Sequence, residues 1–165
     1  MACILSGGLT KDCNYLIGGL SELYLVSKSQ FSGASSTNGV ITAITMSGGS
    51  TFKKIEFEKN TGAFTNELTV SNGQKYITQS VSFSLAKKDA SVIIAADEIA
   101  LGEFVAIAKD RNGNRYLLGR YNGLQASVTT MSSGSGEGDF AGLSVTLTGA
   151  EIEFSQLVNT TIPGF

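Results

Sequence analysis

The sequence contains no histidine and no tryptophan, one proline, two cysteines and few charged residues. Without histidine, the chain cannot form a Ser-His-Asp or Cys-His catalytic site, or a zinc site with a histidine ligand. Two cysteines cannot complete a four-ligand zinc site, and their spacing is not that of a redox Cys-x-x-Cys pair. No nucleophile is paired with a base in any recognisable pattern. We therefore expect no catalytic residues, no enzymatic activity, no metal and no cofactor.

Charge is scarce as well. Charged residues make up 16% of the chain, against ~25% in an average soluble domain. The 12 basic and 14 acidic residues give a net charge of -2, without the basic excess of a nucleic-acid-binding protein. A free monomer relies on surface charge for solubility. We therefore expect other subunits to cover much of the surface.

Long apolar runs are also missing, and none approaches the ~20 residues of a membrane-spanning helix, so we expect no membrane insertion. No Lys or Arg precedes Lys11 and no long apolar core follows it, which argues against a secretory signal peptide and for synthesis in a host cytoplasm. Cytoplasmic thiols stay reduced. A disulfide between Cys3 and Cys13 is geometrically possible, but we expect both residues to pack as small apolar side chains.

The residues that are abundant indicate a β protein. The chain has 20 glycines and many serines and threonines among 42% hydrophobic residues, as in β folds with many turns. At 165 residues it is expected to form a single domain, 1–165. Residues 1–19 are glycine-rich and weakly patterned, and predict an N-terminal arm before a first strand at 20–26. Residues 27–50 predict a long loop, because Ser, Gly and Asn dominate both of its ends.

Alternating side chains predict a long strand at 76–85. Its apolar face comprises Ile77, Val81, Phe83 and Leu85, interrupted by Gln79. The Asn72-Gly73 pair before it predicts a tight hairpin turn, because these residues accept positive φ angles. Asp89 is placed to cap a helix at about 89–101, in which apolar residues recur at helical spacing.

Further strands are expected at 104–108, 115–118, 124–131 and 140–148, with a hairpin turn at 110–114 and a flexible loop at 132–139. The predicted fold class is mostly β (α+β): a β-sandwich of two antiparallel sheets with one flanking helix. The acidic pairs Glu56/Glu58 and Glu151/Glu153 have a period of two, which is most simply the solvated face of a strand but also suits an acidic strip that lines a surface.

Short motifs in the second half of the chain resemble phage tail tube proteins. The carrying stretches are FVAIAKDRNGNRYLLGRYNGL (104–124), the loop SGEGD (135–139) and FAGLSVTLTGAE (140–151). They follow the strand, DRNG hairpin, glycine-rich loop and final strand of that family. The opening, with Cys3, Gly8, Cys13, Gly18 and Gly19, is similar to structural proteins of phages that infect Bacteroidetes.

The resemblance implies a virion structural protein. In that family a β-sandwich with one helix assembles into rings, usually hexameric, which stack into a hollow tail tube that conducts DNA during ejection. The implied partners are further copies of the chain and other tail proteins: a sheath if the tail contracts, a baseplate or a tail terminator. DNA would pass through without specific binding, and the protein would reside in the tail of the virion.

In such a tube, hydroxyls and acids should line the bore, since neutralising phosphates is what creates affinity for DNA. The predicted lumen-facing residues are Glu56, Glu58, Thr78, Ser80, Ser82 and Ser84. The arm is expected to become ordered between rings through Cys3, Leu5, Leu9 and Cys13.

The alternative function is a β-sandwich binding module, such as a capsid-decoration domain or a carbohydrate-binding adhesin domain. Sugar sites usually use exposed aromatic side chains, and the chain has no tryptophan and only five tyrosines.

Overall fold

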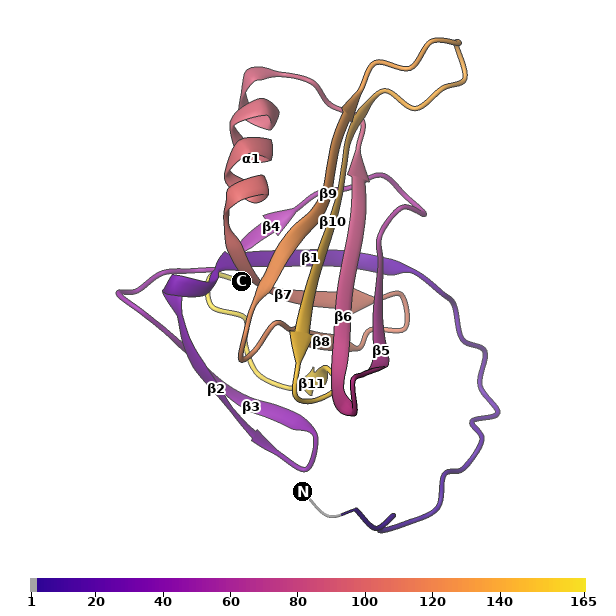
Figure 1. The fold of residues 1–165 in the computed structure, drawn as a ribbon, viewed down its shortest axis with the longest axis vertical. Coiled ribbons are helices and arrows are strands. Elements are labelled where there is room, and N and C mark those ends of the chain that lie inside the picture. The colour runs from indigo at the N-terminus through magenta and orange to yellow at the C-terminus, as the bar shows by residue number, and fades with distance from the viewer. Residues whose placement is uncertain (1–2) are drawn as a thin grey trace.

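The computed structural model describes residues 3–165 and is mostly β, with 49% strand and 9% helix, which confirms the predicted fold class (Figure 1). The elements in chain order are β1 Leu20–Ser27, the short 3₁₀ helix η1 Lys28–Gln30, β2 Phe31–Thr37, β3 Val40–Met46, β4 Lys53–Ile55, β5 Ala63–Ser71, β6 Gln74–Leu85, α1 Ala90–Leu101, β7 Glu103–Asp110, β8 Arg115–Leu118, β9 Leu124–Ser132, β10 Gly142–Glu151 and β11 Gln156–Val158.

The strands form two layers. The first layer is the antiparallel order β5-β6-β10-β9. The second contains β1, β7 and β8, with β4 beside β1 and with β11, β3 and β2 beyond β8. Strands β9, β10 and β6 run across the direction of β1, β7 and β8 (Figure 1), as in steeply crossed sheet packings. Two residue pairs between β7 and β9 join the layers into one continuous ladder, and β3 pairs with β11 in parallel.

The main core fills the space between the layers. It combines Leu23 and Leu25 of β1, Val81 and Phe83 of β6, Leu143, Val145 and Leu147 of β10, and Val92 and Ile99 of α1. A second core lies on the far side of β1 and β7, where Val105 and Ile107 meet Ile41 and Phe52. Because β7 is covered on both faces, its unbroken apolar run from Val105 to Ala108 has the pattern of a fully buried strand.

The prediction of a long loop at 27–50 is wrong. Strands β2 and β3 form a hairpin there, closed by Asn38 and Gly39 with φ angles of 51° and 79°. Positive φ at both central residues is the geometry of a type I′ turn. The side chain of Ile41 is fully buried in the second core, which holds the hairpin to the rest of the sheet.

The helix begins and ends where the sequence predicts. The Asp89 carboxylate accepts a hydrogen bond from the Val92 N–H at 3.1 Å, and the Gly102 N–H donates to the Glu98 carbonyl. Gly102 has an ordinary negative φ, so its missing side chain serves packing instead, since a Cβ there would lie 2.7 Å from the Phe104 ring. None of the helices within residues 3–165 has the length and apolarity needed to cross a membrane.

Asp89→Ala should lower the melting temperature by a few degrees, because the cap of α1 is lost. The Ser91 hydroxyl, the Lys87 ammonium and the Val92 N–H hold the pKa of Asp89 well below its usual range. A carboxyl whose pKa is lowered by folding adds stability above its ordinary pKa of ~4 and loses it as the pH falls further. The difference in melting temperature between wild type and Asp89→Ala should therefore shrink below about pH 4. A difference that stays constant from pH 7 to pH 2 would contradict this account.

Candidate functional site

The outer face of the first layer is covered with hydroxyl groups. Paired residues of an antiparallel sheet point to the same side, so the register places the side chains of four strands on one surface. The polar ones include Thr65, Glu67 and Thr69 of β5, Thr78, Ser80, Ser82 and Ser84 of β6, Ser144, Thr146 and Thr148 of β10, and Thr130 and Ser132 of β9. Ala63, Tyr76 and Val128 lie on the same side of the layer. We call this surface the hydroxyl face. Glu67 is the one charged residue among the side chains that it comprises.

The hydroxyls of this face bond to one another across the strands. Thr69 and Thr78 share a hydrogen bond of 2.7 Å, and Ser84 and Ser144 share one of 2.9 Å. Ser127 of β9 reaches the Thr148 hydroxyl at 3.2 Å. Cross-strand pairs of this kind stabilise a sheet and fix its register. The result is a polar surface whose donors and acceptors are partly occupied and which carries little charge.

Both edges of the first layer lack a further strand over most of their length, although α1 packs beside β9. β5 ends the strand order and pairs only with β6. On the other side, β9 pairs with β7 at Leu124 and Gln125 only, so residues 126–132 lack a second strand partner among the described residues. Unpaired edges of this length are templates for pairing with another chain.

The turn between β5 and β6 shows which groups of β5 face the open edge. Asn72 and Gly73, with φ angles of 51° and 78°, form the predicted two-residue hairpin turn between Ser71 and Gln74. The residues flanking such a turn are hydrogen-bonded to each other, and bonded and non-bonded pairs alternate from there. The N–H groups of Leu68 and Val70 therefore point away from β6. Their side chains are 53% and 59% exposed.

The predicted lumen-facing residues separate into two groups. Thr78, Ser80, Ser82 and Ser84 lie together on the hydroxyl face, each half-buried between neighbouring strands. Glu56 and Glu58 do not belong to it, because β4 ends at Ile55 and pairs with β1 instead of β6.

Glu58 lies beyond the end of β6, where its carboxylate accepts from the Ala86 N–H at 3.3 Å. Glu56 lines a hollow between β4 and α1. After Ile55 the chain leaves the ladder, and the Phe57 ring packs against Gly62, where a Cβ would lie 2.5 Å from it.

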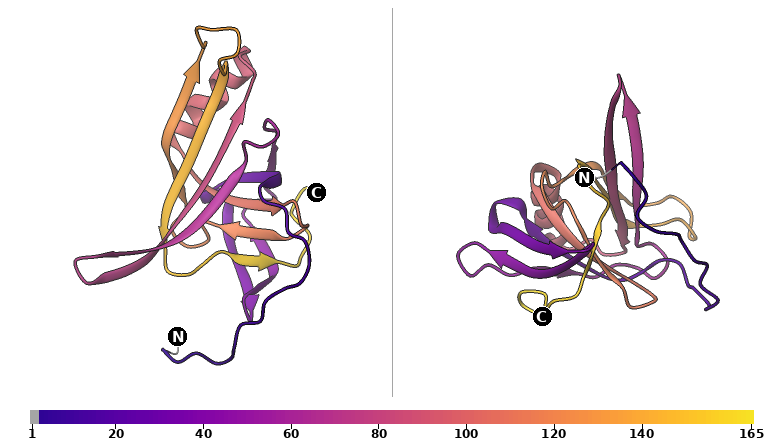
Figure 2. Two further views of the ribbon diagram at one scale, coloured as in Figure 1. Left: turned by 90° about the vertical axis from the view of Figure 1, so that its right-hand side faces the viewer. Right: turned by 90° about the horizontal axis from the view of Figure 1, so that it is seen from below.

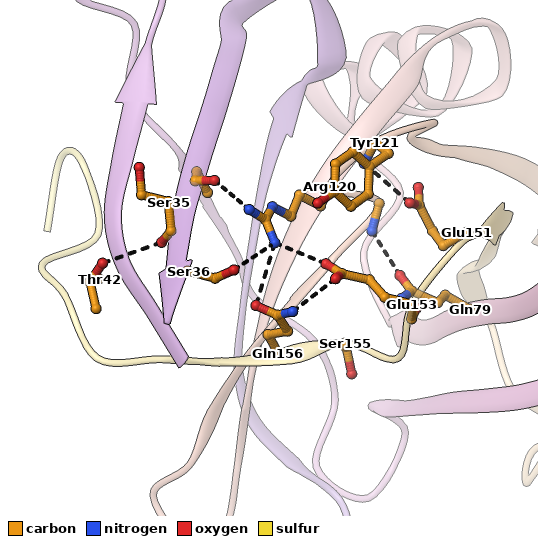
Figure 3. A network of polar contacts seen from close by, with 12 residues as sticks. Ser35, Ser36, Thr42, Gln79, Arg120, Tyr121, Glu151, Glu153, Ser155 and Gln156 are labelled. Carbon is orange, nitrogen blue, oxygen red and sulfur yellow. Dashed lines mark hydrogen bonds and ion pairs between the residues drawn. The ribbon is translucent and has the colours of Figure 1, made fainter. Parts of the chain in front are cut away.

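A buried polar network joins the lower ends of the two layers (Figure 3). The guanidinium of Arg120, in the connection between β8 and β9, forms an ion pair with Glu153 at 3.0 Å. The same group donates to the Ser36 hydroxyl at 3.2 Å and to the Ala34 carbonyl of β2. One side chain thus links the β2–β3 hairpin, the β8–β9 connection and the segment after β10.

Two further side chains of the network are almost fully buried, Gln79 at 2% and Glu151 at 1% exposure. Gln79 accepts from the Gly119 N–H at 2.9 Å and donates to the Glu153 carbonyl at 3.0 Å. The Glu151 carboxylate accepts from three successive backbone N–H groups, those of residues 121, 122 and 123, at 3.1, 2.8 and 3.2 Å.

The prediction that Glu151 and Glu153 form a solvated strand face is therefore wrong. Sequence reasoning missed these residues, although Gln79 interrupts an otherwise apolar face and so marks a buried polar contact.

Residues 3–16 of the arm make no hydrogen bond to the domain, whereas Ile17 and Gly19 are bonded to the turn between β7 and β8. Residues 3–19 contain no helix or strand and every side chain is exposed, and residues 1 and 2 lie outside the described part. Cys3 and Cys13 are free and exposed. Leu5 and Leu9 are 81% and 96% exposed, so the predicted contacts of the arm are not made within its own chain.

The perturbed titratable groups serve structure. Asp139, at the base of the β9–β10 loop, accepts from the Gly136 and Ser135 N–H groups and from the Ser135 hydroxyl, which lowers its pKa. Burial raises the pKa of Tyr24 to about 12, and its hydrogen bond to the Glu22 carboxylate adds to the shift. Neither arrangement includes an activated nucleophile.

The described residues, 3–165, contain no cluster of three or more His, Cys, Asp or Glu side chains that could hold a metal. What the arrangement offers is surface: a hydroxyl face, two open edges and a free apolar arm. No protein-family model, curated protein or solved structure matches this chain.

Proposed function

We propose that this chain is a virion structural protein, the protomer of a hollow phage tail tube built from stacked rings that conducts DNA. The observation that carries the proposal is the four-stranded first layer, which has two open edges and a hydroxyl face. An enclosed channel is the arrangement that uses all three of these features together. The low charge of the chain and its resemblance to tail tube proteins support the same function.

The two open edges are complementary in direction. Because neighbouring strands in the order β5-β6-β10-β9 are all antiparallel, β9 runs opposite to β5. When copies are arranged head to tail, β9 of one copy meets β5 of the next in antiparallel sense, so the ladder continues unchanged across the interface. Such a heterologous contact closes into a ring if its rotation allows. Val128 and Met131 of β9, 53% and 43% exposed, and Leu68 of β5 would be covered.

The stagger of the four strands suits closure. The residues of β6 serve as a common scale along the layer. β5 pairs with residues 74–82 of β6, and β9, related to β6 through β10, lies at the level of residues 80–86. The midpoints of β5 and β9 therefore lie at residues 78 and 83 on this scale. At ~3.3 Å per residue this offset is roughly 16 Å along the strands, over a layer width of roughly 19 Å for four strands ~4.8 Å apart. Full pairing of β9 with the next β5 would therefore tilt the strands by about 40° from the ring axis, within the usual ~35–45° of closed barrels. This tilt does not depend on the number of copies.

The hydroxyl face suits a bore that passes DNA. The opposite face of the layer packs on α1 and the main core, so the hydroxyl face is the side left to line a closed barrel. Lys and Arg bind DNA by neutralising phosphates, and this face includes neither residue type. Hydroxyls and the Glu67 carboxylate form a hydrated surface that does not attract the phosphate backbone of DNA.

Cysteine labelling tests which face lines the bore. Ser82→Cys and Ala100→Cys, each in a Cys3→Ser, Cys13→Ser background, place a thiol on the hydroxyl face and on the exposed side of α1. We expect a bulky maleimide to label both proteins before assembly but only Ala100→Cys in intact tubes. Equally fast labelling of Ser82→Cys in intact tubes would remove the hydroxyl face from the bore.

Electron microscopy of the purified full-length chain tests the function itself. Rings or hollow tubes in negative stain are the expected result, with the protein concentration raised until assembly is complete. A protein that remains monomeric, or forms compact trimers, at every concentration would contradict the tube and favour the binding-module alternative.

A further inference from the structure

A hollow with apolar walls opens between α1 and β4. It has a volume of about 350 Å³, and most of its lining is apolar, including Ile55, Phe83, Val92, Ala95, Ile99 and Leu143. The charged side chains of Lys54, Glu56 and Lys87 also line the hollow. Four of the apolar residues, Phe83, Val92, Ile99 and Leu143, belong to the main core and are at most 8% exposed, so the hollow lies directly over the core. A neighbouring hollow, beside η1, has fewer apolar side chains in its lining, which includes Lys28, Glu98 and Glu103.

The N-terminal arm carries exposed apolar side chains that match the apolar lining of the hollow. Ile17 is held by two hydrogen bonds of 3.0 Å to the Asn112 side chain, whereas residues 3–16 make no hydrogen bond to the rest of the described chain. Residues 3–10 carry no charge. Ile4, Leu5 and Leu9 are 84%, 81% and 96% exposed, which leaves them with apolar surface and no partner within residues 3–165.

The arm and the hollow lie at opposite ends of the protomer. The N-terminal end of the arm lies at one end of the long axis, and α1 lies toward the other (Figures 1 and 2). The strands of the first layer run roughly along this axis, so both ends face neighbouring rings in the proposed tube. At ~3.3 Å per residue, fourteen extended residues reach roughly 46 Å, which is enough to pass from one ring into the next.

We propose that the hollow between α1 and β4 receives the apolar arm of a second copy in the adjacent ring, with Leu9 among the inserted side chains. The inference rests on the proposed function for the position of the second copy. The contact is heterologous, because the arm of one copy enters the hollow of the next. It would give the exposed apolar side chains of the arm a partner, and it would cover the apolar part of the hollow.

Cross-linking between different copies tests the contact. Leu9→Cys and Ala95→Cys proteins, each in the Cys3→Ser, Cys13→Ser background, are mixed and treated with a short bis-maleimide. We expect a dimer of the two proteins, in at least about tenfold higher yield than in a mixture of Leu9→Cys with Asn72→Cys, whose thiol lies at the β5–β6 turn. Equal yields in the two mixtures would overturn the proposal.

A matched pair of helix substitutions gives an independent readout. Ala95→Gln fills part of the hollow, whereas Ala100→Gln adds the same side chain on the exposed side of α1. Both keep good helix propensity. We expect Ala95→Gln to raise the concentration needed for stacking by about tenfold and Ala100→Gln to leave it unchanged. Normal stacking by a folded Ala95→Gln protein would overturn the proposal.

The two hypotheses fail separately. Tubes without the Leu9–Ala95 cross-link would retain the proposed function and reject this docking site. A specific cross-link without rings or tubes would retain the docking contact and reject the tube, since the contact requires only two copies.

Discussion

Leu68→Pro is expected to abolish ring and tube formation while leaving the protomer folded. The N–H of Leu68 faces the open edge of β5, where a neighbouring β9 would accept it. Proline removes this donor and places its ring at the edge, a position that edge strands tolerate. Without this hydrogen bond, and with the proline ring keeping β9 of the next copy away from β5, each interface should lose more than ~1.4 kcal/mol of association free energy. The concentration needed for assembly should therefore rise by more than about tenfold. Sedimentation velocity and negative-stain images measure the effect.

Two controls separate the edge from the fold. Leu68→Thr keeps the N–H and a good strand propensity, and should assemble close to wild type. Thr69→Pro removes an N–H that is bonded to β6, so it should lower the melting temperature as well. Tubes formed by Leu68→Pro at the wild-type concentration would show that β5 is not an edge between copies.

Glu151→Ala is expected to destabilise the protomer by about 3 kcal/mol, because the N–H groups of Tyr121 and Asn122 lose their acceptor and that of Gly123 keeps only the Gly119 carbonyl. In a chain of this size that corresponds to a fall of roughly 10 °C in melting temperature. Chemical denaturation monitored by circular dichroism measures the free energy of unfolding. The change removes the anchor of the connection between β8 and β9.

Glu151→Gln and Glu137→Ala are the controls. The glutamine keeps the shape and one acceptor oxygen, so about half of the loss is expected from weaker, uncharged hydrogen bonds. Glu137 lies exposed in the β9–β10 loop, and its removal should change the free energy of unfolding by less than ~0.5 kcal/mol. A loss in Glu151→Ala no larger than in Glu137→Ala would mean that water replaces the carboxylate at little cost.

The elements with strong local patterns could be predicted from the sequence. β6 alternates over its whole length and α1 carries both its cap and its apolar spacing, so local chemistry and tertiary packing agree there. The β2–β3 hairpin was predictable in principle. Its Asn38-Gly39 turn has the same signal as Asn72-Gly73, but serines and glycines around it dilute the strand pattern.

The buried polar network could not be predicted in the same way. Glu151 and Glu153 have the spacing of an exposed strand face, and their burial depends on Arg120 and on backbone N–H groups about thirty residues away. The misplacement of Glu56 and Glu58 has a similar origin. Their alternation with Ile55 and Phe57 suits a strand, but the strand ends at Ile55, and Phe57 packs against Gly62, which the local pattern does not indicate.

The order in which the chain is synthesised differs from the order in which it can fold. β11 is three residues long, yet it is the strand that joins β3 to β8. Val158 and Ile162 complete the second core around Ile41, more than one hundred residues after the hairpin they secure. Contacts over such separations slow folding, because the loop must close before they contribute. The hairpin at 31–46 therefore leaves the ribosome early, but β3 gains its strand partner outside the hairpin only when residues 156–158 emerge.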